Sequence, residues 1–245
     1  MSAELACPAL FVTGTDTGVG KTIVAAALAR FCSDRGLAVG VMKPVETGVD
    51  DPAQPGADAR LLRWAARATD ADALLAPYRL SQPIAPDQAA RADGVCIDPA
   101  LIAARLTELS QGKDLLLVEG AGGLMVPLRG GYLIADLIRD LELPVLLVTH
   151  PRLGTINHTL LTTFAARGMH LDLAGLIINR MPDQPGLAEK EAPHSLAALA
   201  SADLLAVLPE ASGNSEQQVA ALAEELRQIP TLPWLLNALG IGEKR

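Results

Sequence analysis

A glycine-rich segment near the start of the chain limits most strongly what this sequence can fold into. It reads Gly-Thr-Asp-Thr-Gly-Val-Gly-Lys-Thr from Gly14 to Thr22, follows an apolar run at 10–13, and leads into an alanine-rich stretch at 22–35. A strand, a glycine loop and a helix in this order are typical of a phosphate-binding loop. Glycines permit the tight turn in which backbone N–H groups converge on a phosphate, and the helix start adds free N–H groups and the positive end of its dipole.

The residue types inside this loop predict nucleotide phosphate binding. Lys21 can reach the outer phosphates and the hydroxyl of Thr22 can hold Mg²⁺. In the usual spacing the first glycine would stand at position 15, but here it is Gly14, so the loop carries one extra residue. We expect the phosphates to lie against five consecutive residues, Gly18, Val19, Gly20, Lys21 and Thr22.

Composition and periodicity together indicate an α/β fold. Half of the residues are apolar but only 3% are aromatic, as expected for helices layered on a buried parallel sheet. Strand-length apolar runs recur at 10–13, 38–45, 115–119, 145–149, 173–179 and 204–208. Helical stretches alternate with them at 22–35, 58–68, 99–111, 134–141, 156–167 and 215–228. We therefore expect a mostly parallel sheet flanked by helices in three layers, as one domain over 1–245, with a surface loop at 182–193 and no assignment for 75–94.

Charge and cysteine content exclude several classes of partner. The net charge of −8, without a block of Lys or Arg, is unfavourable for binding nucleic acid or an anionic membrane. The first residues lack the features of a signal peptide, and no run approaches the roughly 18–20 apolar residues of a membrane span. The three cysteines have no metal-like or redox-like spacing. We expect a cytoplasmic protein with ordinary thiols.

Polar residues at the ends of the predicted strands are the next candidates, and each has two interpretations. Lys43 is either a solvated strand end or a cation directed at an anion. Glu119 is either a turn residue or an acidic element for Mg²⁺. Asp58 is most simply a helix N-cap. The helix start at Gly154 follows a strand and is a second possible anion site.

These motifs taken together resemble the dethiobiotin synthetases. The resemblance runs in family order from residue 10 to about residue 209. It rests on the loop with its extra residue, Lys43-Pro44-Val45 with Thr47-Gly48, Asp58 after Gly-Ala, Val118-Glu119-Gly120-Ala121-Gly122-Gly123, Leu153-Gly154-Thr155-Ile156-Asn157-His158, and Asn179 at a strand end. It implies an ATP-dependent ligase of the P-loop NTPase superfamily that acts in biotin biosynthesis.

The resemblance also implies a reaction and a set of roles. CO₂ adds to an amine of 7,8-diaminopelargonate, ATP phosphorylates the resulting carbamate, and the second amine closes the ring of dethiobiotin with loss of phosphate. Bringing two anions together requires positive charge, which Lys21 and Lys43 would supply. By the same resemblance, Mg²⁺ would be held by Thr22, Asp58 and Glu119, and the substrate would contact Thr17, Lys43, Thr47 and Gly122.

Members of this family are homodimers, and the resemblance extends to that arrangement. The helix start formed by Gly154, Thr155, Ile156 and Asn157 would take the substrate carboxylate across the subunit interface, while Asn179 and Pro209 would face adenine. The chain departs from the family in three places. Position 18 is Gly where some members have Glu, Asp87 stands where relatives often have His, and residues 211–245 match poorly.

Two other functions remain open from the sequence. A cobyrinic acid a,c-diamide synthase-like amidoligase shares the loop and the Lys-Pro-Val motif, but it normally adds a glutamine-hydrolysing domain for which 245 residues leave no room. A partition-type or division-site switch ATPase typically has a second lysine near the start of the loop, where this chain has Thr15, Asp16 and Thr17. A requirement for a small-molecule acceptor would distinguish these functions.

Overall fold

The computed structural model, which describes residues 4–242, is built around one central sheet. All six strands of this sheet pair in parallel, in the order β10-β9-β8-β1-β5-β2. The strands are β1 (Ala9–Gly14), β2 (Val39–Met42), β5 (Leu115–Gly123), β8 (Val145–Thr149), β9 (Leu173–Met181) and β10 (Leu204–Pro209). Parallel strands bring their carboxyl ends to one edge, where ligands bind in this class of sheet.

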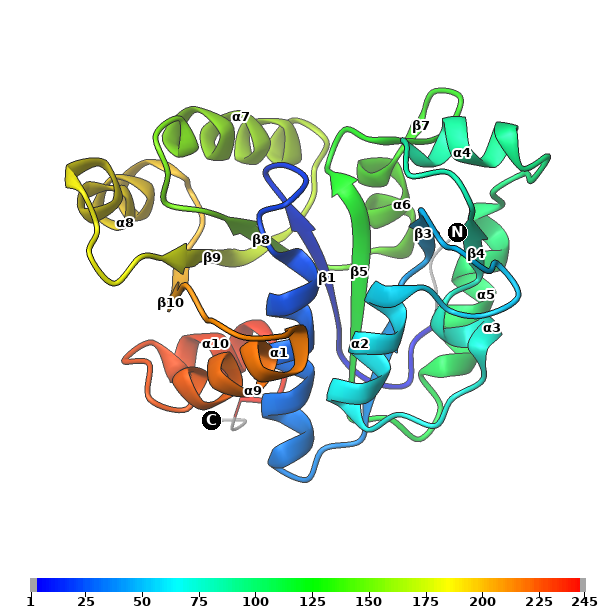
Figure 1. The fold of residues 1–245 in the computed structure, drawn as a ribbon, viewed down its shortest axis with the longest axis horizontal. Helices are drawn as coiled ribbons and strands as arrows, with labels where there is room; N and C mark the ends of the chain where they lie inside the picture. The colour runs from blue at the N-terminus through cyan, green and yellow to red at the C-terminus, as the bar shows by residue number, and fades with distance from the viewer. Residues whose placement is uncertain (1–3, 243–245) are drawn as a thin grey trace.

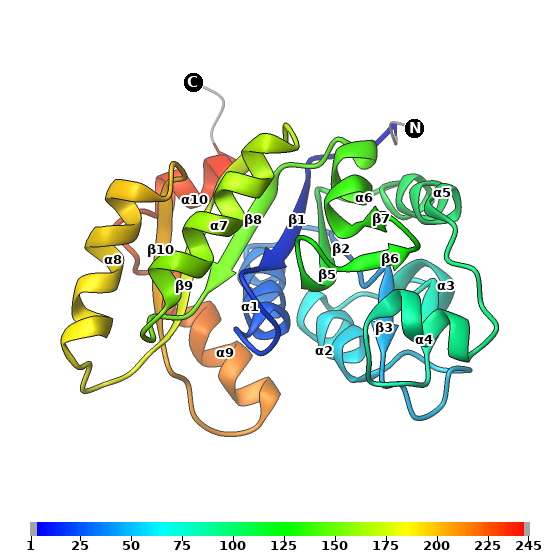
Figure 2. The same ribbon diagram turned by 90° about the horizontal axis from the view of Figure 1, so that it is seen from above.

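Helices cover both faces of the sheet, so the predicted three-layer α/β fold is confirmed (Figures 1 and 2). One face carries α1 (Lys21–Asp34), α2 (Ala57–Ala66), α9 (Ser215–Leu226) and α10 (Leu232–Ala238). The other face carries α5 (Pro99–Leu109), α6 (Ile134–Leu141), α7 (Thr155–Gly168) and α8 (Leu187–Leu199). Alternating side chains of each strand reach opposite layers: Leu115 and Leu117 pack with α1, whereas Leu116 and Val118 pack with α5 and α6.

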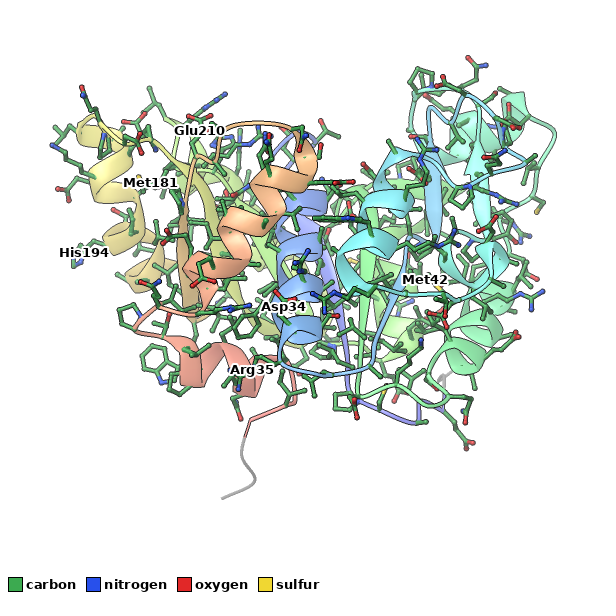
Figure 3. The ribbon with its side chains drawn as sticks, turned by 60° about the horizontal axis from the view of Figure 1, so that its bottom comes forward. Asp34, Arg35, Met42, Met181, His194 and Glu210 are labelled. Atoms are coloured by element: carbon green, nitrogen blue, oxygen red, sulfur yellow. The ribbon has the colours of Figure 1, made fainter. Side chains whose placement is uncertain are left out.

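Ion pairs link three helices of the first face, α1, α2 and α9, near their C-terminal ends. The carboxylate of Asp34, at the end of α1, accepts hydrogen bonds from Arg30, from Arg67 just beyond α2 and from Arg227 just beyond α9 (Figure 3 labels Asp34). Beneath these ion pairs, leucines of α9 and α10 pack in the same apolar cluster as α1: Leu222, Leu226, Leu235 and Leu239. The described part of this segment, residues 211–242, therefore contributes to the core.

The predicted strand at 38–45 is wrong in its extent. The strand stops at Met42 because Lys43 leaves the sheet, its N–H bonding to the carbonyl of Leu75, and Pro44 has no N–H to offer. The chain resumes as β3 (Val45–Thr47), which pairs in parallel with β4 (Tyr78–Leu80) in a separate small sheet. This break places Lys43 at the carboxyl edge of the central sheet.

The surface loop expected at 182–193 is also wrong, because α8 begins at Leu187 and continues through Pro193. Proline removes one helical hydrogen bond, but Ala192 and Leu196 are buried on this helix, and that packing outweighs the local preference. The segment left open at 75–94 contains β4 and α4 (Pro86–Ala92), preceded by α3 (Asp72–Leu75). A hairpin of β6 (Pro127–Arg129) and β7 (Tyr132–Leu133) follows β5.

Candidate functional site

The glycine loop adopts the open turn that its residues predict. Gly18 and Gly20 have φ values of 74° and 92°, in the left-handed region that glycine tolerates. Gly20 is the N-cap of α1 and no side chain caps this helix start. The first N–H groups of α1 therefore face the loop without a side-chain acceptor from the cap, the arrangement that suits an anion.

Two residues near the end of β9 donate hydrogen bonds to carbonyl groups of the loop. Asn179, at the end of β9, donates from Nδ2 to the carbonyl of Val19 at 3.0 Å, and Arg180 donates to the carbonyl of Gly18 at 2.9 Å. A Cβ at Gly20 would lie 2.2 Å from Asn179 Nδ2, so only glycine fits at that position. Arg180 was not anticipated from the sequence, because its role depends on the approach of two segments 162 residues apart.

Lys21 and Thr22 lie at the start of α1 in different environments. The Nζ of Lys21 donates to the carbonyl of Asp16 at 2.9 Å, which folds the lysine back across the loop. Burial lowers the pKa of Lys21, against the attraction of Glu119. The hydroxyl of Thr22 donates to Glu119 Oε1 at 2.7 Å. The first turn of α1 is thus joined directly to β5, in which Glu119 lies mid-strand because the strand continues past its predicted end at 119 to Gly123.

A buried lysine lies between two carboxylates at the sheet edge. Lys43 Nζ is 2.6 Å from Glu119 Oε1 and 2.8 Å from Asp58 Oδ2. Burial of Lys43 opposes its charge, but the two carboxylates outweigh this effect and raise its pKa. Burial also opposes ionisation of Asp58, yet attraction to Lys43 and the hydrogen bond that Lys43 donates hold the pKa of Asp58 below its ordinary value. Lys43 is therefore a fixed positive charge.

Asp58 is not the N-cap of its helix, which corrects the local interpretation. The N-cap of α2 is Gly56, and Asp58 lies within the first turn. In that position the carboxylate of Asp58 points at Lys43 instead of capping its own helix. The sequence pattern missed this because Gly56 gives no capping signal.

The oxygen atoms around Lys43 fit the expected magnesium ion. The hydroxyl of Thr22 and the carboxylates of Asp58 and Glu119 are the hard oxygen donors that Mg²⁺ prefers. Glu119 Oε2 is buried without a hydrogen-bond partner, and burial raises the pKa of Glu119 despite the nearby lysine. A second cation would satisfy this oxygen. Within residues 4–242 no group of three or more His, Cys, Asp or Glu is arranged to hold a metal ion by itself.

These groups line a cavity of about 980 Å³ at the carboxyl edge of the sheet. The cavity brings together most of the predicted site residues: Thr17, Gly18, Gly20, Lys21, Thr22, Lys43, Thr47, Asp58, Glu119 and Gly122. Its further wall, which the sequence did not indicate, comes from Arg60, Leu61 and Trp64 of α2 and from Asn214, Ser215 and Glu216 at the start of α9. The guanidinium of Arg30 lies over the ring of Trp64, 5.4 Å from the ring centre.

The residues expected near adenine lie beside a second, smaller cavity. Asn179 is one wall of a space of about 280 Å³ that Glu210 and Gln218 also line. The Oδ1 atom of Asn179 is buried without a hydrogen-bond partner. Val19 is buried beneath the loop, and half-buried Pro209 ends β10 next to Glu210. Contact of Asn179 and Pro209 with a base stays a prediction.

The predicted helix start at Gly154 is linked to the loop but does not line the large cavity. Gly154 is the N-cap of α7 with φ of 97°, and Ile156 and Asn157 are exposed. The buried hydroxyl of Thr155 lies 2.9 Å from that of Thr149, which is 3.0 Å from the hydroxyl of Thr15. Threonine hydroxyls therefore connect this helix start with the phosphate loop.

Asp87 has a structural contact instead of a place in the cavity. Its carboxylate accepts a hydrogen bond from the N–H of Gly130 at 2.8 Å, in the turn between β6 and β7, and pairs with Arg91 on α4. Of the described residues that line the large cavity, none comes from 75–94. In this chain the segment therefore supports the hairpin after β5.

Comparison with known proteins identifies the fold and the family of this chain. Residues 8–218 match a family model described as an AAA domain. Among solved structures, the MinC:MinD cell division complex of Aquifex aeolicus shares the fold, with a TM-score of 0.57 at 15% identity over 91% of this chain and 98% of that one. A ParA family ATPase of Chlorobium tepidum matches at a TM-score of 0.55 and 13% identity over 96% of this chain and 99% of that one.

The sequence relatives are much more similar. The chain is 38% identical to the ATP-dependent dethiobiotin synthetase BioD of Bacillus velezensis, over 88% of this chain and 92% of that protein. It is 45% identical to the protein of the same name from Frankia casuarinae, over 84% and 85% of the two chains. On the identity and coverage of these relatives, the chain belongs to the family of ATP-dependent dethiobiotin synthetases.

Proposed function

We propose that this protein is an ATP-dependent dethiobiotin synthetase, a ligase that uses ATP and CO₂ to convert 7,8-diaminopelargonate to dethiobiotin in the cytoplasm. The observation that carries the proposal is the buried Lys43, set between Glu119 and Asp58 at the edge of a cavity that the phosphate loop also lines. A fixed cation beside a phosphate loop is what a reaction between two anions requires.

The proposed reaction has three balanced steps. One amine of the substrate attacks CO₂ and loses a proton, which gives a carbamate. A carbamate oxygen then attacks the γ-phosphorus of ATP, and ADP leaves. Finally the second amine attacks the carbonyl carbon, the C–O bond to phosphate breaks, and the amine proton is lost as the cyclic urea forms. Because phosphorylation has already activated the carbonyl, holding the amine next to it supplies most of what the last step needs.

The side chains of the cavity have separate proposed tasks. Lys43 neutralises the carbamate, and Thr17 and Thr47 donate hydrogen bonds to it from the cavity wall. Lys21 leaves the carbonyl of Asp16 to bind the outer phosphates. Bound Mg²⁺ would supply charge neutralisation between the phosphates, held by Thr22, Asp58 and Glu119. The backbone of Gly122, with φ of 72°, lets the chain approach the substrate closely.

A second copy of the chain would complete the substrate site. Four large apolar side chains are exposed along α7 and just before it: Leu153, Ile156, Leu161 and Phe164. Such a group on one helix favours burial against a partner. In a homodimer the start of α7 at Gly154 and Asn157 would meet the partner's cavity and hold the carboxylate of the diamine. Light scattering of Phe164→Glu against wild type tests the dimer.

One experiment tests the reaction itself. Phosphate release from Mg-ATP and bicarbonate is measured with and without 7,8-diaminopelargonate, and the product is identified by mass. We expect release that depends on the diamine, with formation of dethiobiotin. Release without the diamine would instead favour a switch ATPase, whose fold this chain shares at low identity.

Among the described residues no helix has the length and apolar character required to span a bilayer.

A further inference from the structure

A buried carboxylate next to the site has no part in the reaction described above. Glu46 lies in the middle of β3, between Val45 and Thr47, and is only 4% exposed. Burying a carboxylate costs free energy unless it is paired or hydrogen-bonded. No lysine or arginine forms a salt bridge with it among the described residues, so its partners must be of another kind.

The partners of Glu46 are the backbone N–H groups at the start of α2. Its Oε2 accepts from the N–H of Gly56 at 3.0 Å, and its Oε1 accepts from Asp58 at 2.8 Å and from Ala59 at 3.4 Å. These donors would otherwise have no acceptor, because the N-cap residue is glycine and caps nothing. Glu46 therefore acts as a helix cap supplied by another element, with its carboxylate at the positive end of the α2 dipole.

Gly56 provides the room for this contact. A Cβ built on Gly56 would lie 2.3 Å from Glu46 Oε1 and 2.7 Å from Oε2. The backbone of Gly56 is extended, with φ of −72°, so alanine would be tolerated there in every respect except this clash. The carboxylate of Glu46 can thus occupy this place only because position 56 has no side chain.

The contact joins two segments that each carry a proposed site residue. Thr47 follows Glu46 directly, and the N–H group of Asp58 donates a hydrogen bond to Glu46. The carboxylate of Asp58 in turn lies 2.8 Å from Lys43, three residues before Glu46. We propose that Glu46 is a positioning residue: by holding the start of α2 against β3, it fixes the carboxylate of Asp58 where Lys43 and the metal ion require it.

This inference rests on the proposed Mg-ATP chemistry and is tested by readouts that do not need turnover. The main variant is Glu46→Gln, which keeps the shape but places an NH₂ donor opposite backbone N–H donors. The matched control is Asp98→Ala, because Asp98 caps α5 by accepting from Ala100 at 3.0 Å and is absent from the cavity wall. Both variants remove an acceptor from a helix start.

Binding of Mn²⁺, as a probe for Mg²⁺, is followed by electron paramagnetic resonance in the presence of a non-hydrolysable ATP analogue. Glu46→Gln is expected to weaken Mn²⁺ binding by about tenfold, the order found when a residue that orients a metal ligand is lost. Amide hydrogen exchange at 56–59 should accelerate in the same variant. In turnover assays the Mg²⁺ concentration for half-maximal rate should rise, with much of kcat recovered at high Mg²⁺.

The control decides between positioning and simple loss of stability. Asp98→Ala should lower Tm to a similar degree and leave Mn²⁺ binding unchanged. Equal loss of Mn²⁺ binding in both variants, or unchanged binding and exchange in Glu46→Gln, would overturn the proposal. A wild-type protein that forms no dethiobiotin would refute the proposed function alone, because Mn²⁺ binding and exchange still report on Glu46.

A double-mutant cycle gives a second test, should Glu46→Gln fold poorly. Gly56→Ala alone should displace the carboxylate and weaken Mn²⁺ binding as Glu46→Gln does. In a Glu46→Ala background the same change should cost little more, because the clashing atoms are gone. Additive losses would show that Gly56 and Glu46 act independently and would contradict the proposed contact.

Discussion

Two helices on the same face of the sheet begin at a glycine, and their starts differ in what occupies them. At α1 the cap is Gly20, which provides no side-chain acceptor, and the first turn carries no acidic residue. At α2 the cap is Gly56, and the carboxylate of Glu46 fills the space in front of it. Both starts present backbone N–H groups and a positive dipole end, so their chemistry before occupation is the same.

The difference separates binding from positioning. The free N–H groups of an open helix start can bind the anion of a ligand. In a start filled by the protein's own carboxylate, these N–H groups already have an acceptor. The filled start instead becomes a rigid support for the residue it carries, Asp58. We therefore expect ligand anions to bind at the start of α1, and substitutions of Glu46 to change the position of the start of α2.

The largest effect should come from removing the charge of Lys21 at the open start or of Glu119 on the neighbouring strand β5. Lys21→Ala and Glu119→Ala should each lower kcat on the order of 10²–10³-fold, because each removes a fixed group that faces the transferred phosphate or its metal ion. Diamine-dependent phosphate release measures this loss, and circular dichroism checks that the fold is kept. Arg105→Ala, which breaks an exposed pair with Glu108, is the control. Near-normal turnover in either site variant would reject its role.

Bound nucleotide should then distinguish the two starts directly. ATP at about 100 times its dissociation constant should stabilise the protein by about 2.7 kcal/mol. In hydrogen exchange without substrate, the amides at 18–22 should gain protection from ATP analogue alone, while those at 56–59 change little because Glu46 already holds them. Equal protection of both segments would contradict the distinction between an open and a filled start.

A side chain at Gly20 should close the open start. Gly20→Ala forces a left-handed φ on alanine, which costs about 1–2 kcal/mol, and places Cβ against Asn179. In a chain of this size each 1 kcal/mol lowers Tm by about 2–4 °C. Calorimetry should show the lower Tm together with loss of ATP binding. Gly36→Ala is the matched control, because Gly36 also has positive φ but nothing lies within 4 Å of its Cβ position.

The smallest effect concerns acid titration, where Asp58 and Glu46 should differ in sign. Asp58 has a folded pKa below its ordinary value, so its contribution to stability is present above that value and is lost as pH falls below it. Burial raises the pKa of Glu46, although backbone N–H groups and Lys43 oppose this, so ionising Glu46 lowers stability as pH rises above its ordinary range.

Urea unfolding at a series of pH values measures both contributions. The stability difference between wild type and Asp58→Asn should grow as pH rises through the range below about 3.9, the ordinary Asp pKa. The difference between wild type and Glu46→Gln should shrink as pH rises above about 4.3, the ordinary Glu pKa. Parallel curves for the two variants would mean that the two carboxylates experience the same environment.

The sequence predicts the open start far better than the filled one, and the reason is physical. The phosphate loop is a local device, since Gly18, Gly20 and Lys21 act on N–H groups within a few residues, and its pattern is visible in a short window. The parallel sheet and the placement of Lys43 and Glu119 toward its carboxyl side follow from the alternation of strands and helices, whereas the order of the strands does not.

The filled start depends on a contact between residues 10–13 apart that no periodic pattern or capping motif indicates. Glu46 meets Gly56 only because the chain breaks at Pro44 and a separate small sheet forms with β4. A faint signal exists, since Gly56 begins a helix without a Ser, Thr, Asp or Asn cap and such a start needs an acceptor from elsewhere. The helix through Pro193 was missed for a related reason, because tertiary packing outweighs what proline indicates locally.

The leucines that α9 and α10 place beneath α1 have a consequence for any shortened version of this protein. Recognisable similarity to the family model ends at residue 218, inside α9, whereas Leu222, Leu226, Leu235 and Leu239 complete the apolar layer that supports the phosphate loop's helix. A chain cut where similarity ends would expose that layer to water and aggregate. The residues beyond the family model thus contribute to the support of α1, and a reporter or affinity tag belongs after them.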